Sequence, residues 1–192
     1  GGEPEPKGYR NLTCFKLPVK EVIKKAHEYN STLTVFLSAV MMKALLDLQY
    51  EKVLSPEKLK PIKLLIPVNL RSIYSLHTLR NFAMYTIPEL DPRLGEYTFE
   101  EIINIIYHKM GTEVNKKYMS RLITTNVNDE KNILLRIVPL PLKNAVMKAV
   151  FNTVGERKSS LSFSNLGLVK LPEIMKKYVT RFDFILGVQA TA

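Results

Sequence analysis

The feature that most constrains the fold is an apolar segment, from Thr32 to Gln49, with helical periodicity and almost no polar face. Its apolar side chains recur around much of the helix circumference: Leu33, Phe36, Leu37, Val40, Met41, Ala44, Leu45 and Leu48. A helix that is apolar on several sides has to be covered on several sides. We therefore expect this helix to lie at the centre of the fold, with strands and other helices packed around it.

Strand-like and helical patterns alternate along the rest of the chain. Strands are predicted over residues 8–17, 60–71, 80–88, 158–167 and 179–189, and further helices over 18–29, 98–114, 118–135 and 142–154. The clearest helix start is Thr98 followed by Glu101, the pattern of a capping box. Pro67 within its strand indicates a sheet edge or a bulge, because proline has no N–H to donate. The order of elements predicts an α/β (α+β) two-layer sandwich, in which helices pack against a mixed sheet.

Length and composition indicate one globular unit. The chain has 192 residues, of which 46% are hydrophobic and 24% are charged. We expect residues 1–7 to be a tag or linker and residues 8–192 to form one lobe. No apolar run approaches the roughly 18 residues that cross a bilayer, so a soluble, cytoplasmic protein without a membrane partner is expected. The single cysteine, Cys14, fits a reducing compartment, and we expect it to be buried and inert.

The net charge of +10 indicates an anionic partner without identifying it. A basic surface attracts phosphates of nucleic acids, lipids or nucleotide cofactors. Many of the lysines fall on predicted helix faces, where solvation is the usual reason for them. The chain has no zinc-finger spacing and no basic stripe interleaved with aromatic residues, so nucleic acid binding is the weaker interpretation.

Motifs of several enzyme classes are absent. The chain has no Gly-x-Ser-x-Gly elbow, no Walker loop and no dinucleotide-binding fingerprint. His27, His77 and His108 lie far apart without the spacing of metal ligands, so no metal site is expected. His77 falls in a loop that could reach a cleft, but no residue nearby in sequence would orient it as a base. We assign no catalytic residue.

A row of serines is the most unusual strand pattern. In Lys158–Gly167, Leu161 and Phe163 alternate with Ser160, Ser162 and Ser164. Successive side chains of a strand point to opposite faces, so one face of this strand carries hydroxyl groups. Either that face is a solvated sheet edge, or it lines a polar cleft.

A second polar group flanks the connection between two predicted strands. Asn69 and Arg71 precede this connection, and Arg80 and Asn81 follow it. These side chains either hold the shape of the loop or present hydrogen-bond donors to an anionic ligand.

Several short motifs together resemble a known superfamily. They are Ile66-Pro67-Val68-Asn69-Leu70-Arg71, Leu79-Arg80-Asn81-Phe82, Ser162-Phe163-Ser164-Asn165-Leu166-Gly167, Leu171-Pro172 and Arg181-Phe182-Asp183-Phe184-Ile185-Leu186-Gly187. Their order and spacing carry more specificity than any single motif. From Gly8 onward the chain is similar to the second half of bacterial alcohol acetyltransferase-like proteins, of the chloramphenicol acetyltransferase and peptide-synthetase condensation-domain superfamily.

The resemblance implies a chloramphenicol acetyltransferase-like lobe that forms one wall of a tunnel between two lobes. In that superfamily the catalytic histidine belongs to a His-His-x-x-x-Asp-Gly motif in the first lobe. The motif is absent here, since the residues four positions after the three histidines are Ser31, Asn81 and Thr112. This chain alone is therefore expected to be inactive, because acyl transfer needs a positioned base.

The resemblance also implies site residues and partners. Substrate-binding candidates are Ser162, Ser164, Asn165, Asn69, Arg71 and Asn81, and structural motif residues are Arg80, Gly167 and Asp183. The match around Asp183 to the Asp-Phe-Gly-Trp-Gly motif of plant members is partial. Acyl-coenzyme A is implied as a co-substrate rather than a covalently bound cofactor. The implied partners are an alcohol or amine acceptor, an N-terminal lobe of the same protein, and a second copy of the chain through self-association.

Three functional interpretations follow. The first is the C-terminal lobe of an acyltransferase that uses coenzyme A or a carrier-protein thioester. The second is a non-catalytic binding or interaction lobe. The third, which only the charge favours, is a basic nucleic-acid-binding domain.

Overall fold

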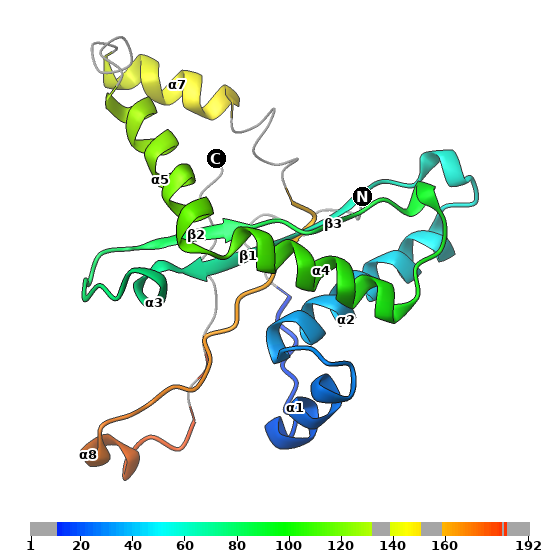
Figure 1. Cartoon of the computed structure of the whole chain (residues 1–192), viewed down its shortest axis with the longest axis horizontal. Coiled ribbons are helices and arrows are strands. Elements are labelled where there is room, and N and C mark those ends of the chain that lie inside the picture. Colours follow the sequence, from blue (N-terminus) through cyan, green and yellow to red (C-terminus); the bar gives the residue numbers. More distant parts are fainter. Residues whose placement is uncertain (1–10, 132–138, 151–158, 182, 184–192) are drawn as a thin grey trace.

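The computed structural model describes residues 11–131, 139–150, 159–181 and 183 (Figure 1). The expected linker over residues 1–7 and most of the strand expected over 179–189 lie outside these residues. The described residues form a mixed α/β architecture with a small mixed sheet. At this level the expected fold class is confirmed.

The sheet is organised around one strand, β1 (Ile62–Asn69), which pairs with the three others. β2 (Ala83–Thr86) and β3 (Glu89–Leu90) are antiparallel to it. Ile66 lies opposite Thr86, and Ile62 lies opposite Leu90. The spacing between the two pairs is four residues along β1 and also four residues from β2 to β3. β2 and β3 therefore share one register with β1. The fourth strand, β4 (Leu161–Ser162), is parallel to β1.

Pro67 occupies a position in β1 where its missing N–H is tolerated. The carbonyls of Lys63 and Leu65 accept hydrogen bonds from the β4 segment, whereas the Leu64 N–H donates to the Pro88 carbonyl at 3.1 Å. Odd-numbered residues of β1 thus direct their polar groups toward β4. Pro67 lies past the end of β4 on that side, where no ladder bond needs its N–H. The strand is paired on both sides at Leu64 and Leu65, so it is an edge only locally.

The central helix expected from the sequence is α2 (Leu33–Lys52), and its central position is confirmed. It packs against β1 and against α4 (Phe99–Glu113), and α1 (Val19–Glu28) lies beside it. The main core contains Val35, Ala39, Met42 and Leu46 of α2, Ile62, Leu64 and Ile66 of β1, and Ile102, Ile103 and Ile106 of α4. One side of α2 is therefore buried, whereas Val40, Ala44 and Leu48 on another side are exposed, so the expectation that the helix is covered on several sides is only partly met.

By length and composition alone, α2 is also apolar enough to cross a membrane. An 18-residue window within it has a mean hydropathy of 1.3. The expectation that no segment of the chain reaches this length and apolarity is therefore wrong. A core helix meets the same criterion, and 33% of this window is buried inside the fold. The contacts with β1 and α4 account for that buried part.

A local sequence signal accounts for the start of α4. The Thr98 hydroxyl accepts a hydrogen bond from the Glu101 N–H, and the Glu101 carboxylate accepts one from the Thr98 N–H, which confirms the capping box of α4. The other described helices are α3 (Leu70–Tyr74), α5 (Lys116–Lys131), α7 (Leu140–Val150), α8 (Glu173–Lys176), η1 (Pro56–Lys58) and η2 (Pro92–Leu94). A second core cluster of Val68, Leu70 and Met119 joins β1, α3 and α5.

Two predicted strands have other bounds, because Leu70 and Arg71 belong to α3 and the strand expected over 80–88 is regular only at Ala83–Thr86. Three further expectations differ from the structure. Residues 11–17, expected to continue a strand, are exposed and have no regular structure. Cys14 lies in this segment and is exposed rather than buried. The serine strand is regular only at Leu161–Ser162. The reason is the same in each case, because alternation makes a strand only where a partner strand supplies hydrogen bonds and cross-strand contacts.

Candidate functional site

The described helices cover one face of the sheet and leave the other uncovered. Along β1, Ile62, Leu64, Ile66 and Val68 are buried, whereas Lys63, Leu65, Pro67 and Asn69 are half-buried or exposed. We call the side of the sheet that carries the second set the outer face. Tyr85 lies opposite Pro67 on this face and is 41% exposed. An ion pair of 3.3 Å between Lys63 and Glu89 lies on the same face.

Within the serine row, Ser162 lies on the outer face, whereas Ser160 lines a pocket together with Leu45 and Leu48 of α2. Leu161 and Phe163 are half-buried and pack against the main core, whereas Ser160, Ser162 and Ser164 are exposed. Ser160 is engaged by β1, because its N–H donates to the Lys63 carbonyl at 2.7 Å and its hydroxyl accepts from the Lys63 N–H at 3.2 Å. Ser162 lies opposite Leu65. Among the described residues, the hydroxyls of Ser162 and Ser164 have no hydrogen-bond partner, so they are available to a ligand.

Asn165 holds the end of the serine segment against the central helix. Its Nδ2 donates to the Thr34 hydroxyl of α2 at 3.1 Å, and its Oδ1 accepts from the Gly167 N–H at 2.9 Å. Gly167 has a φ of 66°, which favours glycine because it lacks a Cβ. Asn165 and Gly167 thus form a turn that is tied to α2.

The second predicted group lies at the end of β1, in the loop that begins with α3. The Asn69 carboxamide oxygen accepts a hydrogen bond from the Arg71 N–H and caps α3. The Arg71 guanidinium donates from Nε to the Thr78 carbonyl at 2.9 Å and from Nη2 to the Arg80 carbonyl at 2.6 Å. Of the two interpretations left open by the sequence, Arg71 therefore holds the loop shape. Asn81 and the side chain of Arg80 are exposed.

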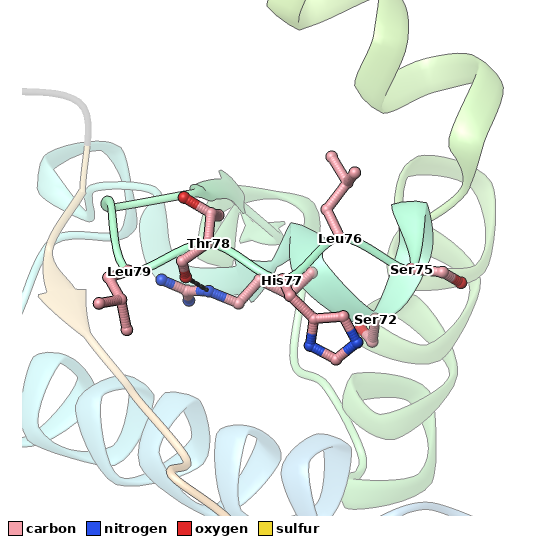
Figure 2. A pocket seen from close by; sticks show the side chains of 7 residues that line it. Ser72, Ser75, Leu76, His77, Thr78 and Leu79 are labelled. Atoms are coloured by element: carbon pink, nitrogen blue, oxygen red, sulfur yellow. Dashed lines mark hydrogen bonds between the residues drawn. The ribbon is translucent and has the colours of Figure 1, made fainter.

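The same loop surrounds a shallow pocket of about 520 Å³ (Figure 2). Its lining includes Arg71, Ser72, His77, Thr78 and Leu79, all from residues 71–79. His77 thus reaches a pocket, as the sequence allowed. In Figure 2 its ring lies beside Ser72, and no described residue forms a hydrogen bond that would orient it. The pocket lacks the partner that a general base usually has.

The structure places the predicted site residues in two groups rather than one. Ser162 is level with Leu65 in the middle of β1, whereas Asn69 is at its end. Four residues of strand separate the two levels, which corresponds to about 13 Å. Asp183 lies in neither group, and its carboxylate pairs with Arg181 at 2.7 Å. Ser162 and Asn69 share the outer face, but their side chains do not converge on one point.

One polar cluster was not predicted from the sequence. The Glu113 carboxylate, at the end of α4, is only 12% exposed and lies 2.7 Å from the Lys109 ammonium group. It accepts hydrogen bonds from the Thr86 hydroxyl of β2 and, at 3.1 Å, from the Tyr118 hydroxyl of α5. The four-residue spacing of Lys109 and Glu113 was a readable signal for one of these contacts. The other two depend on tertiary packing.

Hydrogen bonding decides the protonation of this carboxylate. Burial is the largest influence on Glu113 and raises its pKa, because it disfavours the charged form. The hydrogen bonds from Lys109, Thr86 and Tyr118 together outweigh burial, so the pKa of Glu113 lies below its ordinary value. Glu113 is therefore charged near neutral pH and acts as an acceptor between three elements.

No group of three or more His, Cys, Asp or Glu side chains within the described residues is arranged to hold a metal ion. No family model, curated protein or solved structure matches the chain in comparisons with known proteins. The functional argument therefore rests on the geometry of the chain itself.

Proposed function

We propose that this chain is the C-terminal lobe of a cytoplasmic bacterial acyltransferase that transfers an acyl group from a coenzyme A or carrier-protein thioester to an alcohol or amine. The observation that carries the proposal is the outer face, which presents the Ser162 hydroxyl on a sheet that the described helices cover on one side only, with the exposed Ser164 two residues further along the chain. Such a face suits a substrate wall that is completed by a second lobe. The order of the sequence motifs supports the same lobe type.

In this proposal the serines bind rather than attack. A serine nucleophile needs a base within hydrogen-bond reach to take its proton, and no described residue provides one at Ser162 or Ser164. Their O–H groups can donate to the acceptor or to the oxyanion that forms when the acceptor attacks the thioester carbonyl. The catalytic base would come from the second lobe. The leaving group would be the thiol of coenzyme A or of the carrier protein.

The test uses the protein that includes the coding sequence upstream of Glu3. Thiol release from acetyl-coenzyme A is measured against a panel of alcohols and amines. We expect acceptor-dependent release that falls about 10-fold or more in Ser162→Ala or Ser164→Ala, the size expected when a hydrogen bond worth about 1.4 kcal/mol is lost. Ser55→Ala is the control, because Ser55 makes no side-chain cap bond before η1. Absence of transfer, or equal rates in all three variants, would contradict the proposal.

Exposed apolar side chains favour a second candidate, a lobe that functions in association. In residues 159–181, Leu168 is 84% exposed, Ile174 79% and Tyr178 76%. Apolar residues gathered on one segment indicate a contact surface. An upstream lobe that lacks the double-histidine motif, together with concentration-dependent dimerisation in gel filtration, would favour this candidate over catalysis.

A further inference from the structure

A second pocket lies between the C-terminal end of α2 and the start of β1. In Figure 1 these two segments lie at the end of the sheet opposite α3. Its volume is about 630 Å³, which is in the range of small-molecule sites. Three lysines, Lys52, Lys58 and Lys60, line it together with apolar side chains that include Leu45, Leu48 and Val53. The lining thus combines cationic groups with an apolar surface.

A bidentate contact holds the two sides of this pocket together. The Gln49 side chain donates from Nε2 to the Lys60 carbonyl at 3.0 Å and accepts from the Lys60 N–H at 2.9 Å. Gln49 belongs to the last turns of α2, and Lys60 precedes β1. The contact uses only the backbone of Lys60, so its ammonium group remains available for a ligand.

No carboxylate of the described chain forms an ion pair with the lysines of this pocket. Other lysines of the described chain form ion pairs, such as Lys25 with Glu28 and Lys109 with Glu113. Among the described residues, Lys52, Lys58 and Lys60 form none, and no acidic residue lines the pocket. Lys52 also faces the negative end of the α2 dipole, which offsets part of one charge only. The remaining positive potential attracts an anion.

We propose that this pocket binds a small phosphate-bearing amphiphile. The phosphate lies among the ammonium groups of Lys52, Lys58 and Lys60, and the apolar part contacts Leu45, Leu48 and Val53. Inorganic phosphate would contact only the lysines of the lining, and an uncharged alkyl chain would contact only its apolar side chains. The inference is independent of the acyl transfer proposed above, because it names a separate pocket and requires no reaction.

The test measures binding of octyl phosphate, below its micelle-forming concentration, to the 192-residue chain by titration calorimetry. We expect saturable binding that weakens as salt is raised, because the ammonium groups are solvent-accessible and their attraction is screened. Lys52→Gln, Lys58→Gln and Lys60→Gln should each weaken binding about 2- to 5-fold, the size of an exposed charge pair. Lys20→Gln removes the same charge from exposed α1 and should leave binding unchanged.

The apolar half of the pocket has its own test. Leu48→Asn should weaken octyl phosphate binding and leave the weaker binding of inorganic phosphate unchanged, and octanol alone should bind more weakly than octyl phosphate. Octanoyl-coenzyme A and lysophosphatidic acid carry the same chemistry from two different sources, and displacement by one of them identifies the source. The proposal is wrong if octyl phosphate does not bind, if the lysine and control variants bind equally, or if neither competitor displaces the probe.

Discussion

The Thr86 hydroxyl of β2 donates a hydrogen bond to the Glu113 carboxylate at the end of α4. Thr86 is 1% exposed, so its hydroxyl has no access to water. The Glu113 carboxylate also accepts a hydrogen bond from the Tyr118 hydroxyl of α5 and forms an ion pair with the Lys109 ammonium group. One carboxylate therefore links the sheet to two consecutive helices. It is the most connected polar side chain that the sequence alone did not indicate.

Replacing this carboxylate should destabilise the fold. Glu113→Ala leaves the buried Thr86 hydroxyl without its acceptor, and a buried polar group without a partner costs about 1–3 kcal/mol. Chemical denaturation should show this loss in the free energy of unfolding. Glu57→Gln removes an exposed charge in η1 and should change stability by less than about 0.5 kcal/mol. Equal stability of the two variants would contradict the structural role of Glu113.

The same carboxylate should make stability depend on pH under acidic conditions. The pKa of Glu113 is lower in the folded chain than in the unfolded chain, where it is about 4.3. Its contribution is therefore fully present above the unfolded pKa and is lost as pH falls through the folded pKa. The difference in unfolding free energy between the wild type and Glu113→Gln should be constant between pH 6 and 7 and shrink below about pH 4. A difference that grows on acidification would show that the pKa is raised instead.

Arg71 should be required for the order of the loop that follows it. Arg71→Ala removes the donors to the Thr78 and Arg80 carbonyls, and each lost hydrogen bond is worth about 0.5–1.5 kcal/mol. Hydrogen exchange of residues 72–80 should accelerate. Arg71→Lys should restore order only in part, because one ammonium group cannot reproduce the planar pair of donors. Arg80→Ala keeps the accepting carbonyl and should leave exchange in the loop unchanged, which makes it the matched control.

Asn165 should determine how firmly the serine segment is held to α2. Asn165→Ala removes both its contacts, and amide exchange over residues 160–167 should accelerate roughly 2- to 10-fold. Asn165→Asp keeps the acceptor for the Gly167 N–H and can accept a hydrogen bond from the Thr34 hydroxyl, so a smaller effect than that of Asn165→Ala is expected. Thr34→Val removes the same contact from the α2 side. If Thr34→Val leaves exchange unchanged, the contact with α2 contributes nothing to the order of the segment.

Ser38 offers a substitution that should stabilise the chain. Its side chain is buried in α2, and its hydroxyl has no hydrogen-bond partner among the described residues. Ser38→Ala removes this desolvated group and improves helix propensity, so a gain of about 1 kcal/mol is expected. Thermal unfolding should show Tm rising by about 2–4 °C. Ser120→Ala is the contrast, because the Ser120 hydroxyl contacts the Tyr74 hydroxyl at 2.6 Å and its loss should lower Tm.

The elements that could be predicted are those whose signals are local. The capping box of Thr98 and Glu101, the helix that follows Pro18 and the all-round apolar α2 each depend on residues within a few turns of one another. The alternation of Leu161 with Ser162 is local too, and it correctly assigns the two faces of β4. These helix boundaries and this face assignment were therefore readable, because the helical and strand periods fix which side chains share a face. The start of α3 at Leu70 was not, because it falls inside a predicted strand.

What the sequence determined by itself was a set of amphipathic elements, one apolar helix that had to be central, and a hydroxyl-bearing strand face. The tertiary structure alone decided that β1 has partners on both sides, that residues 11–17 and Cys14 stay exposed, and that the serines and the Asn69 end of β1 form separate groups. It also decided that Thr86, Glu113 and Tyr118 meet. The physical reason is that strand pairing and buried hydrogen bonds require partners from distant parts of the chain, and local periodicity does not specify those partners.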